Sequence, residues 1–449
     1  MGDILLCIGL TVVGLIVLGA IALKIFKRGP LTFRIDGFYT HVMDGDPGPV
    51  IRDVQRDALS GLECRLDDPM SCSIEAAVQC QTQGDRPDCN VLLLSGGGQW
   101  GAFGAGLFDR LAERSGAQQL GLDNIGVITG ISTGSLQTLM LMVALDSQQT
   151  PDMRRYALDR LVWGYSPRRE SEVVRRTGLM FVPFFGSAAG TAPLKRRIIE
   201  ALCPAGNCKL VEAIGASSIA GYAGFVEADD GTFRYADLRE LVNKAPSLEN
   251  AAEALAAATM ASSAMPVFHQ QLRVAGSDGQ AVSLYDGGVR RSVFFDRTMA
   301  IVDREVRKEM ATKGLAKAAG DVTQAAFAEE YRRTAPKVYV VRNGPTVRKP
   351  APELNTKSGP LKNGQRGYDL LVNESEIGAI AALRLGNPYG EILLTTADQY
   401  DTFPSDVGEN FKEAEMFKPA FMARLRDLGR YKADRPGGAW WPLSPLQER

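Results

Sequence analysis

The sequence predicts an α/β fold with a central, mostly parallel sheet. Two stretches carry this prediction, because each places a short apolar strand directly before a helix. The first is a strand at 91–95 with a helix to about residue 113, and the second is a strand at 125–129 with a helix over 135–145. Alternation of strands and helices along a chain is typical of parallel sheets. The chain has 449 residues, which is room for one large α/β domain with additions or for two domains.

The turn between the second strand and its helix reads Gly130-Ile131-Ser132-Thr133-Gly134. This Gly-x-Ser-x-Gly pattern is typical of a nucleophile elbow, a sharp turn that lifts a serine Oγ clear of the sheet. Gly130 and Gly134 would let backbone and helix approach without a Cβ between them. The pattern alone is weak in a chain with 47 glycines, and a Ser132 that only caps the helix is the alternative.

The first strand leads into a glycine-rich loop, Gly96-Gly97-Gly98-Gln99-Trp100-Gly101. Consecutive glycines before a helix let backbone N–H groups converge on an anion, which an oxyanion hole requires. The candidate oxyanion-hole residues are Gly96, Gly97, Gly98 and Gly101. The spacing also matches a dinucleotide-binding fingerprint, but that site needs an acidic residue after the next strand. The next strand ends Ile128-Thr129-Gly130, without an acid.

A third stretch, Tyr285-Asp286-Gly287-Gly288, ends a further apolar run and places a carboxylate at a sheet edge. The chain has only two histidines, His41 and His269, and neither follows Asp286 as a Ser-Asp-His order requires. Unless His269 serves out of order, the simpler arrangement is a dyad in which Asp286 takes the Ser132 proton directly. A carboxylate base acting near neutral pH needs a raised pKa, which burial can supply.

In the order and spacing of these motifs, residues from about 90 to 300 resemble the patatin-like phospholipases. The resemblance rests on the glycine loop 95–102, the elbow 130–134, the run 261–266 (Ala-Ser-Ser-Ala-Met-Pro) and Asp286-Gly287-Gly288. It implies a three-layer α/β/α fold and a Ser132/Asp286 dyad that hydrolyses fatty-acyl esters of membrane lipids or phospholipids through an acyl-Ser132 intermediate.

Two positions depart from that family. Trp100 stands where the family usually has Arg or Lys, so the substrate head group would be met differently. After Asp286-Gly287-Gly288 the chain continues Val-Arg-Arg, where the family often has Asn-x-Pro.

The intact motifs favour an enzyme over a non-catalytic lipid-binding scaffold on the membrane. Attack on the acyl-serine by an alcohol instead of water would make the protein an acyltransferase, and the sequence leaves this open.

The formal net charge of −1 gives no indication of nucleic-acid binding. We expect no cofactor and no metal requirement, because the sequence contains no Asp-x-Asp-x-Asp-Gly calcium loop. The sequence does not indicate an oligomeric state.

Residues 1–28 are predicted to be an N-terminal transmembrane helix that anchors the chain. Ile4 to Leu23 carries no charge and is long enough to span a bilayer. A cleaved signal peptide is the alternative, although such peptides usually have a basic start and a shorter apolar core. Lys24, Lys27 and Arg28 follow the span, so the positive-inside rule places the catalytic part in the cytoplasm.

The cysteines indicate the opposite side of the membrane. Six of the seven lie outside the predicted span: Cys64, Cys72, Cys80, Cys89, Cys203 and Cys208. The turn between Cys203 and Cys208 could close a small disulfide loop, and an even count fits an oxidising, extracytoplasmic compartment. Buried free thiols are the alternative.

The remaining chain is divided by its composition. Residues 29–89 are predicted to form a membrane-proximal extension, 90–300 the catalytic core, and 301–449 a C-terminal part that completes the α/β domain. The last part is expected to hold the final strand of the sheet at 337–341, a polar loop at 345–367, helices over 368–385 and 411–430, and a short strand at 391–396.

Two further stretches allow two interpretations each. The arginine-rich stretch 151–176 is either a solvated face with acidic partners or a contact for anionic lipid, and the apolar run 178–186 is either core or an acyl-binding loop.

Overall fold

The computed structural model describes residues 30–35, 38–43, 90–115, 124–177, 187–266, 268–275, 281–294, 335–347, 360–387, 389–404, 416–436 and 438–443, together with residues 17, 70, 122, 328, 329, 331 and 332. The predicted anchor at 4–23 lies outside these residues except for Val17. The apolar run 178–186 and the cysteines at 7, 64, 72, 80 and 89 also lie outside them. Within the described residues, no helix combines the length and apolarity needed to cross a bilayer.

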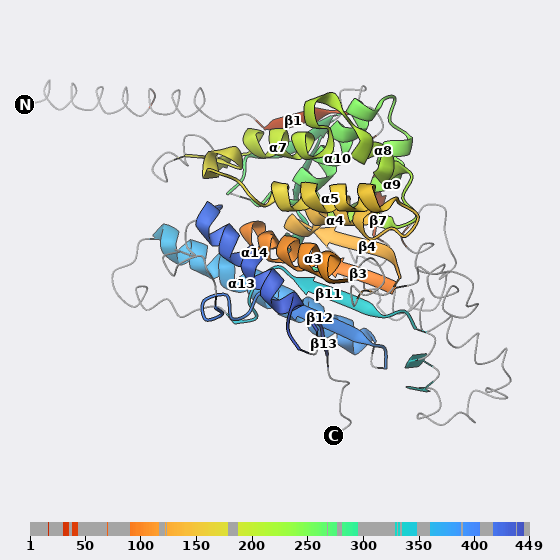
Figure 1. Ribbon diagram of the computed structural model, residues 1–449. Coiled ribbons are helices and arrows are strands. Elements are labelled where there is room, and N and C mark those ends of the chain that lie inside the picture. Colours follow the sequence, from red (N-terminus) through yellow and green to blue (C-terminus); the bar gives the residue numbers. More distant parts are fainter. Residues whose placement is uncertain are drawn as a thin grey trace, which may run out of the picture.

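In the described part of the chain, a mixed sheet of eleven strands forms the centre of the fold (Figure 1). Its middle strands run parallel, in the spatial order β7 (Ala220–Glu227), β4 (Ile125–Ile131), β3 (Asn90–Leu94), β11 (Val338–Arg342) and β12 (Ile392–Thr396). Antiparallel pairs extend the sheet through β8 (Phe233–Asp237), β10 (Ala281–Asp286), β9 (Leu272–Ala275) and β13 (Trp441–Pro442). The described part of the chain is therefore an α/β fold around a mostly parallel sheet, as predicted.

Two short strands near the N-terminus complete the sheet. β1 (Leu31–Arg34) pairs in parallel with β9, and β2 (His41–Val42) pairs antiparallel with β8. Part of the stretch expected to form a separate extension thus belongs to the central sheet. A second, small sheet joins β5 (Arg175–Arg176) to β6 (Ala189–Gly190).

Helices cover both faces of the sheet. Leu92 and Leu94 point into a large core with the helices on one face, whereas Val91 and Leu93 point into a second core. The helices of the first face are α3 (Gly101–Ser115), α4 (Thr133–Ala144), α5 (Pro151–Gly164), α7 (Ala192–Leu202), α8 (Lys209–Gly215), α9 (Leu238–Asn243), α10 (Leu248–Ser262) and α14 (Pro419–Ala433). The second core receives side chains of α13 (Pro360–Gly386). Alternation of side chains along each strand produces these two cores.

The C-terminal part differs from expectation in three elements. β11, expected to be the last strand, lies inside the sheet between β3 and β12. The helix expected over 368–385 begins at Pro360, within the stretch expected to be a loop, and the helix expected over 411–430 begins at Pro419. Proline is favoured in the first turn of a helix, where its missing N–H has no partner to lose.

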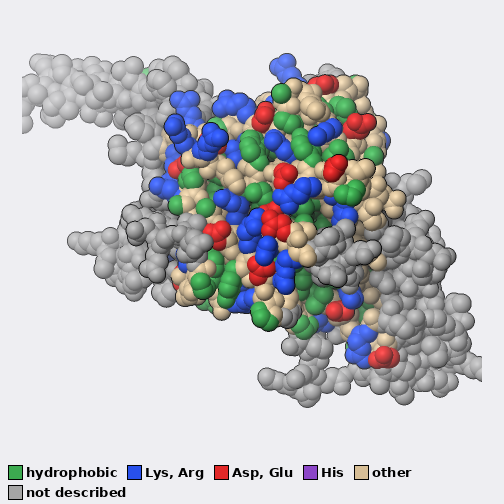
Figure 2. All heavy atoms as spheres, in the orientation of Figure 1, with side chains coloured by type: hydrophobic (Ala, Val, Ile, Leu, Met, Phe, Trp, Pro, Cys, Tyr) green, Lys and Arg blue, Asp and Glu red, His purple; other side chains and the backbone are tan. Residues whose placement is uncertain are grey.

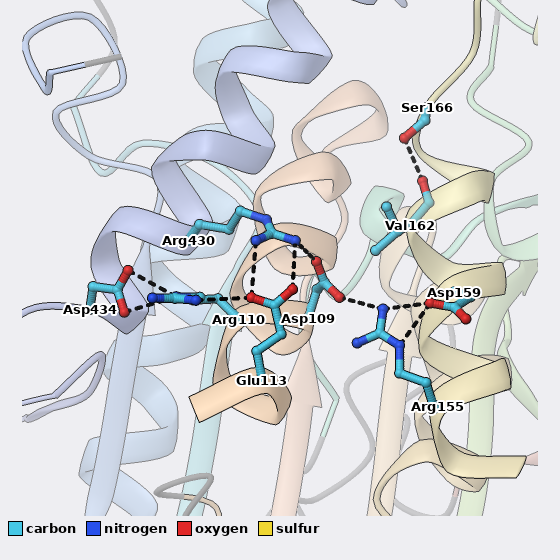
Figure 3. Close-up of polar contacts among 9 residues, drawn as sticks. All are labelled: Asp109, Arg110, Glu113, Arg155, Asp159, Val162, Ser166, Arg430 and Asp434. Carbon is cyan, nitrogen blue, oxygen red and sulfur yellow. Dashed lines mark hydrogen bonds and ion pairs between the residues drawn. The ribbon is translucent and has the colours of Figure 1, made fainter. Parts of the chain in front are cut away.

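An ion-pair network connects α3, α5 and α14 (Figure 3). Asp109 of α3 accepts hydrogen bonds from Arg155 of α5 at 2.8 Å and from Arg430 of α14. Arg110 of α3 binds Asp434, just after α14, at 2.9 Å. Figure 2 shows basic and acidic side chains gathered in the middle of this face. Loss of either arginine would leave the buried Asp109 carboxylate less compensated, so the network couples α3 to α5 and α14.

This network also bears on the arginine-rich stretch 151–176. Arg155 is paired with Asp109 and Asp159, and Arg176 is paired with Glu170. These two arginines therefore have the acidic partners that a solvated, salt-bridged face predicts.

Candidate active site

Ser132 is the single turn residue between β4 and α4. Its backbone has φ 52° and ψ −121°, a left-handed conformation that is uncommon for a residue with a side chain and that marks functional turns. A Cβ on Gly130 would overlap the carbonyl group of Gly134, and a Cβ on Gly134 would overlap the carbonyl group of Leu94. Glycine is therefore needed at both positions for the strand and helix to meet at this angle.

Asp286 ends β10 and lies beside Ser132. Its side chain accepts a hydrogen bond from the N–H of Gly288 at 2.7 Å. The residue is 6% exposed. Burial raises the pKa of the Asp286 carboxyl to about 7, against the Gly288 N–H and the Ser132 side chain, which both lower it, and the negative charge of Glu376 adds to the rise. A carboxylate with a pKa near neutrality is suited to take a proton from a serine hydroxyl.

The residues that end α10 hold both groups in place. The Oγ of Ser262 accepts the N–H of Ser132 at 2.8 Å and donates to the carbonyl of Gly224 at 2.6 Å. Two residues later, the carbonyl of Ala264 accepts the N–H of Asp286 at 3.0 Å. The helix end and the turn after it thus set the positions of the serine and the aspartate relative to each other.

The glycine loop runs past Ser132 on the other side. Gly97 and Gly98 have positive φ values of 141° and 56°, and a Cβ on Gly97 would overlap the carbonyl of Asn343. Gly98 borders the same cavity as Ser132. A Cβ on Gly96 would lie 3.3 Å from the Cβ of Ser132. The loop backbone is therefore placed where it can meet an oxyanion formed on a substrate at Ser132.

Gly101 has a different position from the other three loop glycines. Its N–H donates to the carbonyl groups of Gly98 and Gln99 within the turn that opens α3. A side chain on Gly101 would overlap Thr133 and Tyr165. Gly101 therefore permits close packing of α3 against the elbow, and its N–H is not directed at a substrate.

A cavity of about 80 Å³ opens beside Ser132. Most of its lining is apolar, from Leu136, Leu139, Met140, Leu161, Val173, Leu194, Ile198, Ala201, Phe417 and Met422. Its polar lining includes His269 and Ser263. A mostly apolar pocket that ends at a serine is suited to an acyl chain whose ester carbon lies at Oγ.

A family model described as patatin-like phospholipase matches residues 92–299. This region belongs to the patatin-like phospholipase family. The family consists of carboxylic ester hydrolases that act on lipids. No curated protein matches the chain.

Among solved structures, the chain is similar to the crystal structure of VipD from Legionella pneumophila. The sequences are 10% identical, and the TM-score is 0.30. The match covers 76% of this chain and 65% of that chain. A likeness at this level adds no argument about the site.

Trp100, which stands where patatin-like proteins usually have a basic residue, is part of the core. It is 6% exposed and packs edge-on against Tyr400 and Phe421, with ring centroids 4.8 and 5.2 Å away. The adjacent Gln99 accepts the N–H of Phe417 at 2.6 Å through its side chain. Trp100 therefore ties the glycine loop to the C-terminal elements and does not border the cavity.

After Asp286, where the family often has Asn-x-Pro, this chain forms a short helical turn, Gly287–Val289. The N–H groups of Arg290 and Arg291 both donate to the carbonyl of Gly287, at 3.0 and 2.8 Å. Backbone hydrogen bonds thus close this turn.

Asn343, which directly follows β11, was not anticipated from the sequence. Its side-chain amide donates to the carbonyl of Ser95 at 2.9 Å and to the side chain of Gln137 at 3.0 Å. Its own N–H donates to the Oγ of Ser95 at 3.0 Å. Asn343 and Gln137 are fully buried, so they fix the start of the glycine loop against α4. No local motif marks either residue, because their partners are distant in sequence.

His269 is close to the site but is not paired with Ser132 in the way a triad requires. Its Nδ1 lies 2.6 Å from the carbonyl of Ser263, so Nδ1 carries the proton, since a carbonyl only accepts. Burial lowers the pKa of the imidazole to about 4, so the ring is neutral at physiological pH. The Ser132 side chain instead acts on Asp286, where it lowers the pKa of the carboxyl.

Proposed function

We propose that the protein is a membrane-anchored serine hydrolase that cleaves fatty-acyl esters of membrane lipids through an acyl-Ser132 intermediate. The observation that carries the proposal is the position of Ser132 in a strained elbow turn beside a mostly apolar cavity, together with the buried Asp286, whose carboxyl pKa the Ser132 side chain lowers. The phospholipase family of residues 92–299 supports a lipid ester as the substrate.

In the first step, the Asp286 carboxylate takes the Ser132 proton while Oγ attacks the ester carbon. The negative charge that develops on the ester oxygen is stabilised by backbone N–H groups of Gly97 and Gly98, assisted by the N-terminus of α4. The ester C–O bond then breaks, and the alcohol leaves with the proton from Asp286. In the second step, water attacks the acyl-serine, gives a proton to Asp286, and the fatty acid leaves as Oγ regains that proton.

The membrane anchor remains a proposal that rests on the uncharged run 4–23. The Cys203–Cys208 disulfide in the structure supports an extracytoplasmic location, because disulfides persist in oxidising compartments. The basic residues after the span support the cytoplasm instead. Alkylation of thiols in intact cells, followed by mass spectrometry, decides between them: a modified Cys203 or Cys208 would place the domain in the cytoplasm.

Free fatty acid released from mixed phospholipid vesicles tests the function. Ser132→Ala and Asp286→Asn should each abolish fatty-acid release. A cooperative thermal unfolding transition should show that each variant is still folded. Ser166→Ala is a matched control, because the Ser166 hydroxyl only donates to the carbonyl of Val162 at the end of α5 (Figure 3), and it should leave release unchanged. If the wild type releases nothing from any lipid or short-chain ester, the non-catalytic scaffold is favoured.

A further inference from the structure

Three consecutive residues at the C-terminal end of α10 hold three different groups of the site. The Ser262 hydroxyl holds the backbone of Ser132, and the Ala264 carbonyl holds the backbone of Asp286. Between them, the Ser263 carbonyl accepts the Nδ1–H of His269. The imidazole is therefore oriented by the same turn that positions the catalytic serine and aspartate.

The backbone of His269 is also fixed. Its N–H donates to the carbonyl of Met265 at 2.9 Å. The residues on either side bond to Ala189, through the Phe268 carbonyl at 2.8 Å and the Gln270 N–H at 3.0 Å. The ring cannot turn without breaking these contacts or the bond to Ser263.

Among the residues that the structure describes, the other ring nitrogen, Nε2, has no hydrogen-bond partner. This nitrogen is buried, and His269 borders the cavity that Ser132 also borders. Because Nδ1 holds the only proton of the neutral ring, Nε2 presents a lone pair. A buried acceptor without a donor costs free energy, so an O–H or N–H group of a molecule bound in the cavity would satisfy this atom.

We propose that Nε2 of His269 accepts a hydrogen bond from the water that attacks acyl-Ser132, and that it thereby selects water over alcohols. The inference rests on the proposed function. Water has two O–H groups: one gives its proton to Asp286 as the oxygen attacks, and the other donates to His269. An alcohol has a single O–H, which Asp286 must take, so it cannot make the second hydrogen bond.

The proton balance does not require the imidazole to become charged. The first water proton moves to Asp286 and then to Oγ as the bond between the acyl carbon and Oγ breaks. The second stays on the newly attached oxygen, in the carboxylic acid product. His269 acts as a positioning residue for the acyl acceptor, and it makes the protein a hydrolase in preference to an acyltransferase.

The test measures how the acyl-enzyme divides between two products. A p-nitrophenyl fatty-acyl ester is supplied with an excess of methanol, which has a single O–H. Nitrophenol reports acylation, and the ratio of methyl ester to fatty acid reports the choice of acceptor. For His269→Phe we expect nitrophenol release in the first turnover to stay within about twofold, and the ratio to rise roughly tenfold, the worth of one hydrogen bond. Because both products come from one acyl-enzyme, the ratio does not depend on how much of the variant is folded.

Two further variants complete the design. His269→Gln offers a side-chain oxygen as acceptor and should restore part of the preference for water. His41→Gln is the matched control, because His41 binds Glu240 at 2.7 Å and does not border the cavity, and its ratio should equal that of the wild type.

Other outcomes would overturn the inference. An unchanged ratio in His269→Phe would show that Nε2 does not contact the acceptor, and a lower ratio would show that it holds the alcohol. A parallel loss of first-turnover nitrophenol with no change in ratio would place His269 in acylation. If the wild type releases no nitrophenol while it is folded, the proposed function itself fails, and this inference fails with it.

Discussion

Replacing Asp286 with asparagine should make the protein more stable while removing its activity. Asparagine has nearly the same shape, and its side-chain oxygen can still accept the N–H of Gly288, which lies 2.7 Å from the carboxylate. The substitution removes a negative charge from a buried position. A variant that merely damaged the fold would lose stability together with activity, so the opposite change in stability is diagnostic.

The magnitude follows from the pKa of the Asp286 carboxyl, which burial raises from 3.8 to about 7 in the folded protein. Between these two pH values, the folded protein binds a proton that the unfolded chain has released. The free energy of unfolding of the wild type therefore falls as pH rises through this window and is constant above about pH 7. A pKa change of this size corresponds to about 4 kcal/mol. This value is the upper limit for the increase in the free energy of unfolding that Asp286→Asn produces.

Urea unfolding of the wild type and Asp286→Asn across this pH range measures the difference. The variant should match the wild type near pH 4 and exceed it by up to about 4 kcal/mol above pH 7. Asp230→Asn serves as a control, because hydrogen bonds from Thr232 lower the pKa of the exposed Asp230, and its loss should not stabilise the protein at neutral pH. A difference for Asp286→Asn that does not change with pH would refute a raised pKa.

Three further predictions concern the pH profile, the glycine loop and the disulfide. The acylation rate of the wild type should rise with pH and level off near pH 7, because Asp286 can take the Ser132 proton only in its ionised form. Equal acylation rates below and above pH 7 would contradict the role of Asp286 as the base. Asn343→Ala should lower the free energy of unfolding by about 3 kcal/mol, since buried partners lose hydrogen bonds, and it should slow acylation roughly tenfold. Acylation at the wild-type rate would show that Asn343 does not position the glycine loop. Cys203→Ser should lower the free energy of unfolding by about 2 kcal/mol through loop entropy without changing turnover, and equal stability with and without reductant would show unpaired thiols.

The parts of the site that could be predicted from the sequence are those with local causes. The elbow, the glycine loop and the strand before Asp286 each combine a short apolar run with glycines that the backbone requires. Their strands and helices lie within a few residues of the expected positions. The pairing of Ser132 with a carboxylate in place of a histidine was predicted from the histidine count, and it stays a prediction.

The parts that could not be predicted depend on contacts distant in sequence. The position of β11 inside the sheet follows from its pairing with β3 and β12, which no local pattern encodes. Asn343 gains its role from a loop about 250 residues earlier, through Ser95. From the sequence, His269 is known only as one of the two histidines of the chain. The orientation of its ring depends on the Ser263 carbonyl.

The central claim is that Ser132 is the nucleophile and Asp286 is its base. Labelling with a fluorophosphonate near pH 8, followed by peptide mass spectrometry, tests both parts at once. We predict a single adduct on Ser132 in the wild type, none in Ser132→Ala, and labelling slowed by about a thousandfold or more in folded Asp286→Asn. An adduct on another serine, or labelling of Asp286→Asn at the wild-type rate, would contradict this account.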